Sequence, residues 1–428
     1  MRITPALSGQ RVSEIAQSFD LRDLPQEFYA NPYPIYDWLR EHEPVRRMPD
    51  GSLFLTRHAD LVSIYKDAQT FSSDKQAEFT PKYGQGSPLH EHHTNSLVFN
   101  DPPLHTRVRK IIMGALSRRA IAEMETGLIE LVNGLLNRIE TQGGGDLIED
   151  FASAIPVEII GNLLGIPHED RGPLRAWSLA ILGALEPKLS PAQEAIGNAS
   201  VREFKAYMQS LVHERRNRPG DPEHDVLTRL IQSEPQLSEV ELLQNCIFIL
   251  NAGHETTTNL IGNALIALQE HPQALKDALS INEHSTQEIR RLTASFDTAW
   301  DTAIDECLRF ESSNQLSNRR ALREFELGGQ SYPAGTLLTL CIGAANRDPA
   351  VFDNPNELRL GRTPNKHLAF GYGIHQCAGL QLTRLEGRIA ISRFLQRFPS
   401  YQLAQAPIRG GRARFRGFLK APFVTARG

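Results

Sequence analysis

One cysteine in this 428-residue chain has a setting that suits metal chemistry. Cys377 lies in the glycine-rich stretch FGYGIHQCAG (370–379), which runs directly into a helical pattern. Gly371 and Gly373 permit backbone angles closed to other residues, and Gly379 permits close approach of a flat partner. A helix N-terminus stabilises a thiolate, as does a metal. A lone thiolate in a hydrogen-bonded loop suits the axial position of haem iron.

The local sequence leaves other roles for Cys377 open. A single cysteine is commonly a buried structural residue. Zinc is disfavoured because no C-x-x-C or H-x-x-x-H pattern supplies further ligands. A nucleophilic pair with His375 is also disfavoured, since two positions across a glycine loop are not how Cys–His pairs are normally assembled.

A second reactive stretch interrupts the longest apolar helix that the chain predicts. The S-x-x-E capping box of Ser238 and Glu241 and the stop at Pro272 predict about 34 helical residues, about 51 Å long. The part LLQNCIFIL is apolar nearly all round, which indicates a central buried helix. At 252–258 (AGHETTT) the residues form helices poorly, and Glu255 is costly to bury. We expect a π-bulge or kink here; a threonine-rich surface turn is the alternative.

Two short pairs of charged residues also fall on predicted helices. Glu306 and Arg309 are three positions apart and share a helix face. His105 and Arg109 are four apart at the start of a helix, and both side chains can be cationic. Each pair alone is a weak signal, because most such pairs lie on solvated surfaces.

At this point a family resemblance is clear. The cysteine stretch matches F-G-x-G-x-H-x-C-x-G at every fixed position and resembles the haem-thiolate loop of the cytochrome P450 family. The resemblance extends from about residue 20 to the C-terminus. It implies haem b as cofactor and Cys377 as the proximal iron ligand. It also implies that Phe370, Gly371 and Gly379 contact the haem.

The resemblance assigns further residues around the haem. Ala252 would lie against the cofactor, and Glu255 and Thr256 resemble the acid–alcohol pair that delivers protons during oxygen activation. The resemblance also implies four partners for the haem propionates, with Arg320 a competing register for one of them. These four are His105, Arg109, Arg319 and His375.

The resemblance gives the E-x-x-R pair a structural role. Arg362, shortly before the cysteine loop, matches the arginine that joins Glu306 and Arg309 in the family. The three would hold the proximal side so that Cys377 meets iron in a fixed geometry. Leu358 stands where the family generally has an aromatic residue, so local packing there differs.

The implied reaction is insertion of one oxygen atom from O2 into a small organic substrate. Electrons would come from a separate ferredoxin and its NAD(P)H-dependent reductase, because no fused redox domain or G-x-G-x-x-G motif is present. Residues 74–100, 180–196 and 311–318 would form the substrate walls, and the polar last stretch suggests a substrate with hydrogen-bonding groups. A peroxide-driven peroxygenase and a haem sensor or carrier without turnover are the alternatives. Six cations could dock the ferredoxin, with a solubilising surface role the alternative for each: Arg107, Lys110, Arg118, Arg119, Arg384 and Arg388.

The elements that must position these residues are mainly helices. Apolar spacing of three and four dominates, and the strand-like pieces are short, as in SLFLTR, REFELGGQSYPAGTLLTLCI and RFRGFLKAPFVT. This pattern predicts a mainly α fold with small antiparallel β-sheets, the haem lying between the long central helix and the cysteine loop with its helix. With no repeat or long linker, we expect one domain over 1–428, with residues 1–20 a flexible N-terminus.

Composition narrows the function further. The net charge of −4 argues against nucleic acid as the partner, despite the arginine–glycine run at 409–417. Four scattered cysteines indicate a reducing compartment. No apolar run is long enough to span a membrane, and the N-terminus lacks a signal-peptide core, so we expect a cytoplasmic protein. The histidines of HEHH (90–93) could bind a metal, but adjacent histidines in a polar loop are more often exposed, and we expect exposure here.

Overall fold

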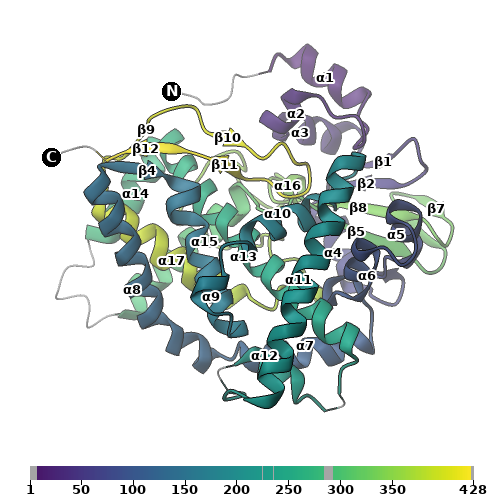
Figure 1. Ribbon diagram of the computed structural model, residues 1–428. Helices are drawn as coiled ribbons and strands as arrows, with labels where there is room; N and C mark the ends of the chain where they lie inside the picture. Colours follow the sequence, from purple (N-terminus) through teal and green to yellow (C-terminus); the bar gives the residue numbers. More distant parts are fainter. Residues whose placement is uncertain (1–6, 224, 235, 284–292, 426–428) are drawn as a thin grey trace.

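The computed structural model describes residues 7–223, 225–234, 236–283 and 293–425, and it is mainly helical with small sheets (Figure 1). The α-helices are α1 Gly9–Gln17, α2 Gln26–Ala30, α3 Tyr33–His42, α4 His58–Lys66, α5 Gln76–Tyr83, α6 Pro88–Asn95, α7 Leu104–Ala115, α8 Arg118–Gln142, α9 Ala154–Leu164, α10 Leu174–Gly183, α11 Pro191–Asn217, α12 Val226–Ile231, α13 Glu239–Glu270, α14 Pro272–Glu283, α15 Thr293–Phe310, α16 Ile342–Ala345 and α17 Leu380–Arg397. The strands are β1 Val45–Arg47, β2 Leu53–Leu55, β3 Phe71–Ser72, β4 Gly144–Asp146, β5 Leu316–Ala321, β6 Phe325–Leu327, β7 Gln330–Tyr332, β8 Leu337–Cys341, β9 Gln402–Leu403, β10 Ile408–Arg409, β11 Phe418–Lys420 and β12 Pro422–Val424.

The long helix α13 runs through the middle of the molecule, with α9, α10, α11 and α17 packed around it (Figure 1). It begins with the predicted capping box, in which Ser238 and Glu241 each bond the other's backbone N–H. The predicted bulge at 252–258 is wrong, because α13 is continuous there. The hydroxyls of Thr256 and Thr258 donate to carbonyls one turn earlier, at 2.7 and 2.9 Å. These threonines thus bond within the helix without breaking it.

The sheets are small, as predicted, but they are not all antiparallel. The five-stranded sheet has the order β1-β2-β8-β5-β3, and β2 pairs with β8 in parallel. A parallel pair needs a long crossover connection, which local strand spacing does not reveal. The other sheets, β4-β12-β9, β10-β11 and β6-β7, are antiparallel.

The N-terminal expectation is wrong for residues 9–20. Helix α1 is capped by Ser8, and Ile15, Ala16 and Phe19 are buried against Phe28. Residues 1–6 lie outside the described part of the chain.

The main hydrophobic cluster draws its residues from Phe79 to Phe423, and two smaller clusters lie in the N-terminal and sheet regions. A single domain stays a prediction. Within the described residues, no helix is long and apolar enough to cross a membrane.

Candidate active site

The cysteine loop is a tight hydrogen-bonded turn ahead of α17. The N–H of Cys377 donates to the carbonyl of Phe370 at 2.8 Å, so the two ends of the loop are joined. Gly371 and Gly373 have φ of 65° and 72°, the left-handed region that favours glycine. Cys377 forms no disulfide and is partly exposed. Burial raises the pKa of its thiol, while the Gly379 N–H and the Arg109 cation lower it.

One face of α13 borders an open space. Phe248, Ala252 and Thr256 are partly exposed, whereas Leu250 and Glu255 beside them are buried. Positions four apart lie on one helix face. Because the other faces of α13 are packed, partial exposure here requires a space beside this face. Helix α17, which follows the cysteine loop, packs directly on α13.

The two residues of the predicted acid–alcohol pair have different surroundings. The Thr256 hydroxyl donates to the carbonyl of Ala252 at 2.7 Å. The Glu255 carboxylate is buried and forms an ion pair with Arg412. Burial raises the pKa of Glu255, and the Arg412 cation opposes this rise.

The structure brings the four predicted propionate partners together near Cys377. The rings of His105 and His375 lie 4.1 Å apart, and the cations of Arg109 and Arg319 act on both. Arg319 is buried, and its cation lies over the Tyr65 ring, 5.1 Å from the centroid. These residues come from α7, β5 and the turn that carries His375.

This cationic cluster has a carboxylate nearby, Asp101, whose charge opposes the lowering by burial of the pKa of both His105 and Arg319. Burial, with Arg319, His105, Arg109 and other cations, lowers the pKa of His375 to about 2. Within the described residues, no carboxylate forms an ion pair with Arg109 or Arg319. The Nε2 atoms of His105 and His375 are buried without hydrogen-bond partners in the same residues. Buried cations need anionic partners, so the site fits a large flat group with carboxylates, as haem has.

The strand register distinguishes Arg319 from Arg320. Successive side chains of a strand point to opposite faces, so only one of them can join the cluster. Arg319 is the one that acts on His375; Arg320 is more exposed and its strand position pairs with Ser72.

Glu306, Arg309 and Arg362 form a buried network, as the resemblance implies. Glu306 accepts hydrogen bonds from Arg309 at 2.7 and 2.9 Å and from Arg362 at 3.0 and 3.1 Å. The side chains of Glu306 and Arg309 are 0% exposed. Asn365 and the N–H of Arg359 also donate to Glu306.

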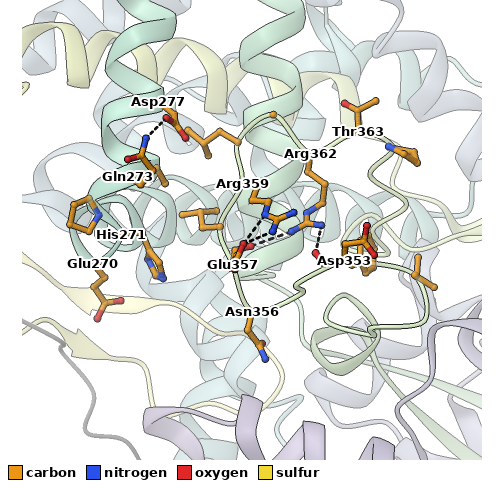
Figure 2. Close-up of a pocket in the computed structure, with 18 residues that line it drawn as sticks. Glu270, His271, Gln273, Asp277, Asp353, Asn356, Glu357, Arg359, Arg362 and Thr363 are labelled. Atoms are coloured by element: carbon orange, nitrogen blue, oxygen red, sulfur yellow. Dashed lines mark hydrogen bonds and ion pairs between the residues drawn. The ribbon is translucent and has the colours of Figure 1, made fainter.

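A cavity of about 930 Å³ borders this network and is lined in part by Arg362 (Figure 2). It is lined by the end of α13, the start of α14 and the segment 351–364. Figure 2 shows Arg362 bonded to Asp353 and Glu357. The Nε atom of Arg362 also donates to Glu306, which the figure does not draw. Neither Cys377 nor Glu255 lines this cavity, so it is not the candidate site.

Two buried ionisable side chains near the site were not predicted from the sequence. Lys75 is buried beside the cationic cluster and pairs with Glu78 at 2.8 Å. Glu386 of α17 is buried, contacts Thr257 of α13, and has a pKa raised by burial to about 8. Only its place, nine residues after Cys377 on the helix that follows the loop, connects it with the loop.

The expectation for the HEHH stretch is wrong. His90, His92 and His93 are buried, because α6 packs against α11 and α13. His92 bonds Gln244 at 2.9 Å and lies 3.4 Å from Asn251. No group of three potential metal ligands occurs in the described ranges.

Arginines of the 409–417 run face the protein interior. Arg416 pairs with Glu311, and Arg414 donates to the carbonyl of Leu316 and to Asn318. Such internal bonds leave these side chains unsuited to binding nucleic acid.

Comparisons with known proteins agree with this geometry. The family model of cytochrome P450 matches residues 178–405. Polyketide biosynthesis cytochrome P450 PksS of Bacillus subtilis (strain 168) is 33% identical over 395 residues, which are 89% of this chain and 92% of that protein. Vitamin D(3) 25-hydroxylase of Pseudonocardia autotrophica is 35% identical over 382 residues, 88% and 89% of the two chains.

Solved structures show the same fold. P450BioI, in complex with an acyl carrier protein ligated with hexadec-9Z-enoic acid, matches with a TM-score of 0.84 and 31% identity. The match covers 93% of this chain and 100% of P450BioI. This chain belongs to the cytochrome P450 family of haem b monooxygenases.

Proposed function

We propose that this enzyme inserts one oxygen atom from O2 into a small organic substrate, with electrons from a separate ferredoxin and its NAD(P)H-dependent reductase. The observation that carries the proposal is the grouping of a loop-held thiol with two arginines that form no ion pair in the described chain, Arg109 and Arg319, and with the unpartnered Nε2 atoms of two buried histidines. When bound, haem iron supplies the reductive activation of dioxygen.

Cys377 holds the iron in this proposal. The loop fixes the backbone of Cys377 through its bond to Phe370, and the partly exposed sulfur is accessible to a bound group. Metal binding deprotonates the thiol, which overcomes the effect of burial on its pKa. Gly371 and Gly379 have no side chain that would obstruct a flat cofactor, and Phe370 would contact it.

The cationic cluster binds the propionates. Hydrogen-bond donors from three elements would hold the propionates, and this would fix the orientation of the haem. The donors belong to His105, Arg109, Arg319 and His375. The propionates would also neutralise the charges of Arg109 and Arg319.

Glu255 and Thr256 move protons into the site. The pKa of Glu255 is raised by burial, so its carboxyl gains and loses a proton closer to neutrality than an exposed glutamate does. Thr256 is partly exposed beside α13, and its hydroxyl, which donates to the Ala252 carbonyl, is free to accept a hydrogen bond. Ala252, one turn earlier, presents only a methyl group to the cofactor.

Fewer than six of the predicted cations are free of ion pairs in the part of the chain that the structure describes, and so available to dock a ferredoxin. Four of them are paired within the chain: Arg107 with Glu241, Arg119 with Glu123, Arg384 with Asp305, and Arg388 with Glu125 and Asp297. Lys110 and Arg118 form no ion pair within the described residues, and they remain candidates for docking.

The substrate class is drawn from relatives and from the walls of the site. The polarity of 311–318 is largely satisfied inside the chain, for example by Ser313 donating to the Thr256 carbonyl at 2.7 Å. This weakens the expectation of a substrate rich in hydrogen-bonding groups. Structures of relatives hold testosterone and myristic acid. These two compounds and vitamin D3 are therefore the first probes for substrate-induced spectral shifts.

The test of the relay compares Thr256→Ala and Glu255→Gln with wild type, using surrogate ferredoxin and reductase and the probe that gives the largest spectral shift. Both variants should bind haem normally. Thr256→Ala should release most reducing equivalents as peroxide, and Glu255→Gln should slow turnover at least tenfold. Unchanged coupling and rate in both variants would overturn the relay.

The same assay separates the alternatives. Full product yield with hydrogen peroxide alone, without NAD(P)H, would identify a peroxygenase. Probe binding without NAD(P)H consumption would identify a sensor or carrier.

A further inference from the structure

The acid of the proposed relay has a charged partner from a distant part of the chain. Oε1 of Glu255 pairs with Nη2 of Arg412, which lies in the segment joining β10 to β11. The side chain of Glu255 is 2% exposed and that of Arg412 is 13% exposed. A pair so shielded from water is little weakened by salt.

Residues 410–417 are here named the hairpin tip. Backbone hydrogen bonds anchor its second half to residues 313–315, and the Gly410 N–H donates to the Gly417 carbonyl at 3.1 Å. The Arg414 carbonyl accepts the Gln315 N–H, and the Arg416 N–H donates to Ser313, both at 2.8 Å. The other side begins with Gly410 and Gly411, the latter at φ 60°. Glycines give this side backbone freedom that the anchored side lacks.

Glu186 fastens the hairpin tip next to Arg412. Glu186 lies between α10 and α11, and its carboxylate accepts the N–H of Ala413 at 2.7 Å and that of Arg414 at 3.0 Å. Its carbonyl accepts from Lys82 of α5 at 2.7 Å. The α10–α11 connection is therefore bonded to the two residues that directly follow Arg412.

We propose that Arg412 is the positioning residue of the Glu255 carboxyl, and that Glu186 is a latch which holds Arg412 in place. The inference rests on the proposed role of Glu255 in proton transfer. When the α10–α11 connection lies against the hairpin tip, Glu186 grips two backbone N–H groups and Arg412 reaches Glu255. When the connection moves away, the glycine side of the tip is released and Arg412 withdraws.

This latch would link substrate enclosure to proton delivery. Residues 180–196 are expected to form part of the substrate wall, and Glu186 lies among them. The closed connection then encloses the substrate and sets the charge beside Glu255 through the same two hydrogen bonds. An open connection leaves Glu255 buried without its cation.

The latch can be tested by the direction in which a substitution shifts the pKa of Glu255. Burial has the largest effect and raises the pKa of Glu255; Arg412 lowers it, the negative charge of Glu186 raises it, and the amide of Asn259 lowers it. Removing the Glu186 charge alone would therefore lower this pKa. Releasing Arg412 would raise it, and Arg412 has the larger effect.

The experiment titrates the protonated Glu255 carboxyl by infrared spectroscopy in the substrate-free haem enzyme, with Glu255→Gln assigning the band. Arg412→Gln should raise the pKa of Glu255 by about one to three units. Arg412→Lys, which keeps the charge, should restore most of the wild-type value. Arg409→Gln is the matched control, because Arg409 pairs with Glu311 from the same hairpin. This substitution should leave the pKa of Glu255 unchanged.

Glu186→Ala decides whether the latch exists. A rise in the pKa of Glu255 supports it, and a fall shows only the lost negative charge and overturns it. Hydrogen exchange is the second measurement: amides 410–414 should exchange at least tenfold faster in Glu186→Ala than in the exposed control Lys188→Gln. Equal exchange would also overturn the latch.

The outcomes distinguish the latch from the proposed function. If Glu255→Gln leaves turnover and coupling intact, the relay fails whatever Arg412 does. If Glu255→Gln slows turnover while Arg412→Gln and Glu186→Ala leave the Glu255 titration unchanged, the relay stands and the latch fails.

Discussion

Glu306→Gln should destabilise the enzyme severely, because it removes the only carboxylate that the described structure pairs with Arg309. Arg309 is fully buried, and its other bonds go to the carbonyls of Asn346, Pro355 and Glu357. Carbonyls accept hydrogen bonds but do not neutralise the charge. Breaking a buried pair by removing one partner costs about 3–5 kcal/mol.

That loss is large against the whole stability of a folded protein, about 5–15 kcal/mol. Glu306 also accepts from Arg362, so its loss frees the segment that precedes the cysteine loop. We therefore expect Glu306→Gln to lose haem during purification and to unfold at much lower urea concentration. Urea unfolding followed by far-ultraviolet circular dichroism, together with haem content per chain, measures both effects.

Glu357→Gln is the matched control. Glu357 pairs with Arg359, and the two side chains are 59% and 43% exposed, so this pair is worth less than about 1 kcal/mol. If Glu306→Gln costs no more than this control and keeps its haem, the reasoning from burial is wrong.

Three further predictions concern the core around the site. Glu386 stays protonated in the fold up to its pKa of about 8, whereas the unfolded chain ionises it from 4.5, so stability should fall by about 1.4 kcal/mol per pH unit between these values. Urea unfolding between these pH values should show this fall in the free energy of unfolding for wild type, and a smaller fall for Glu386→Gln. The same slope in both proteins would refute the buried, protonated Glu386. Burial lowers the pKa of His92 from 6.5 to about 4, so stability should fall as the pH drops through this window, and His92→Gln should remove part of that loss in an acid titration where exposed His168→Gln does not. Gly373→Ala should weaken haem retention, because its Cβ would overlap the Tyr65 carbonyl and φ is 72°, at a cost of at least about 1–2 kcal/mol; Gly361→Ala, whose Cβ meets nothing within 4 Å, should be neutral, and equal haem retention in both would count against the argument.

Local sequence signals predicted the central helix and the cysteine loop well. Ser238, Glu241 and Pro272 are capping and stop signals that act within one turn, and the helix begins and ends where they indicate. The glycines of the loop likewise mark positive φ directly. The continuous path of α13 through its threonines was not predictable, because packing on several sides outweighs weak helix propensity.

Long-range contacts explain why the sequence did not predict the surroundings of the remaining residues. Arg412 reaches Glu255 from the C-terminal hairpin, and no spacing rule connects these positions. His92 and His93 have a polar local sequence, yet α11 and α13 cover them. Nothing in the local sequence marks Lys75 and Glu386 as buried, and only the assembled fold covers them.

The central claim is that the sulfur of Cys377 binds haem iron. The most direct measurement is the absorption spectrum of the dithionite-reduced, carbon-monoxide-bound protein, recorded for wild type and Cys377→Ser. The account predicts the red-shifted Soret band of thiolate ligation in wild type and its loss in the variant. A wild-type protein that takes up no haem, or a Cys377→Ser protein with the same carbonyl spectrum as wild type, would contradict it.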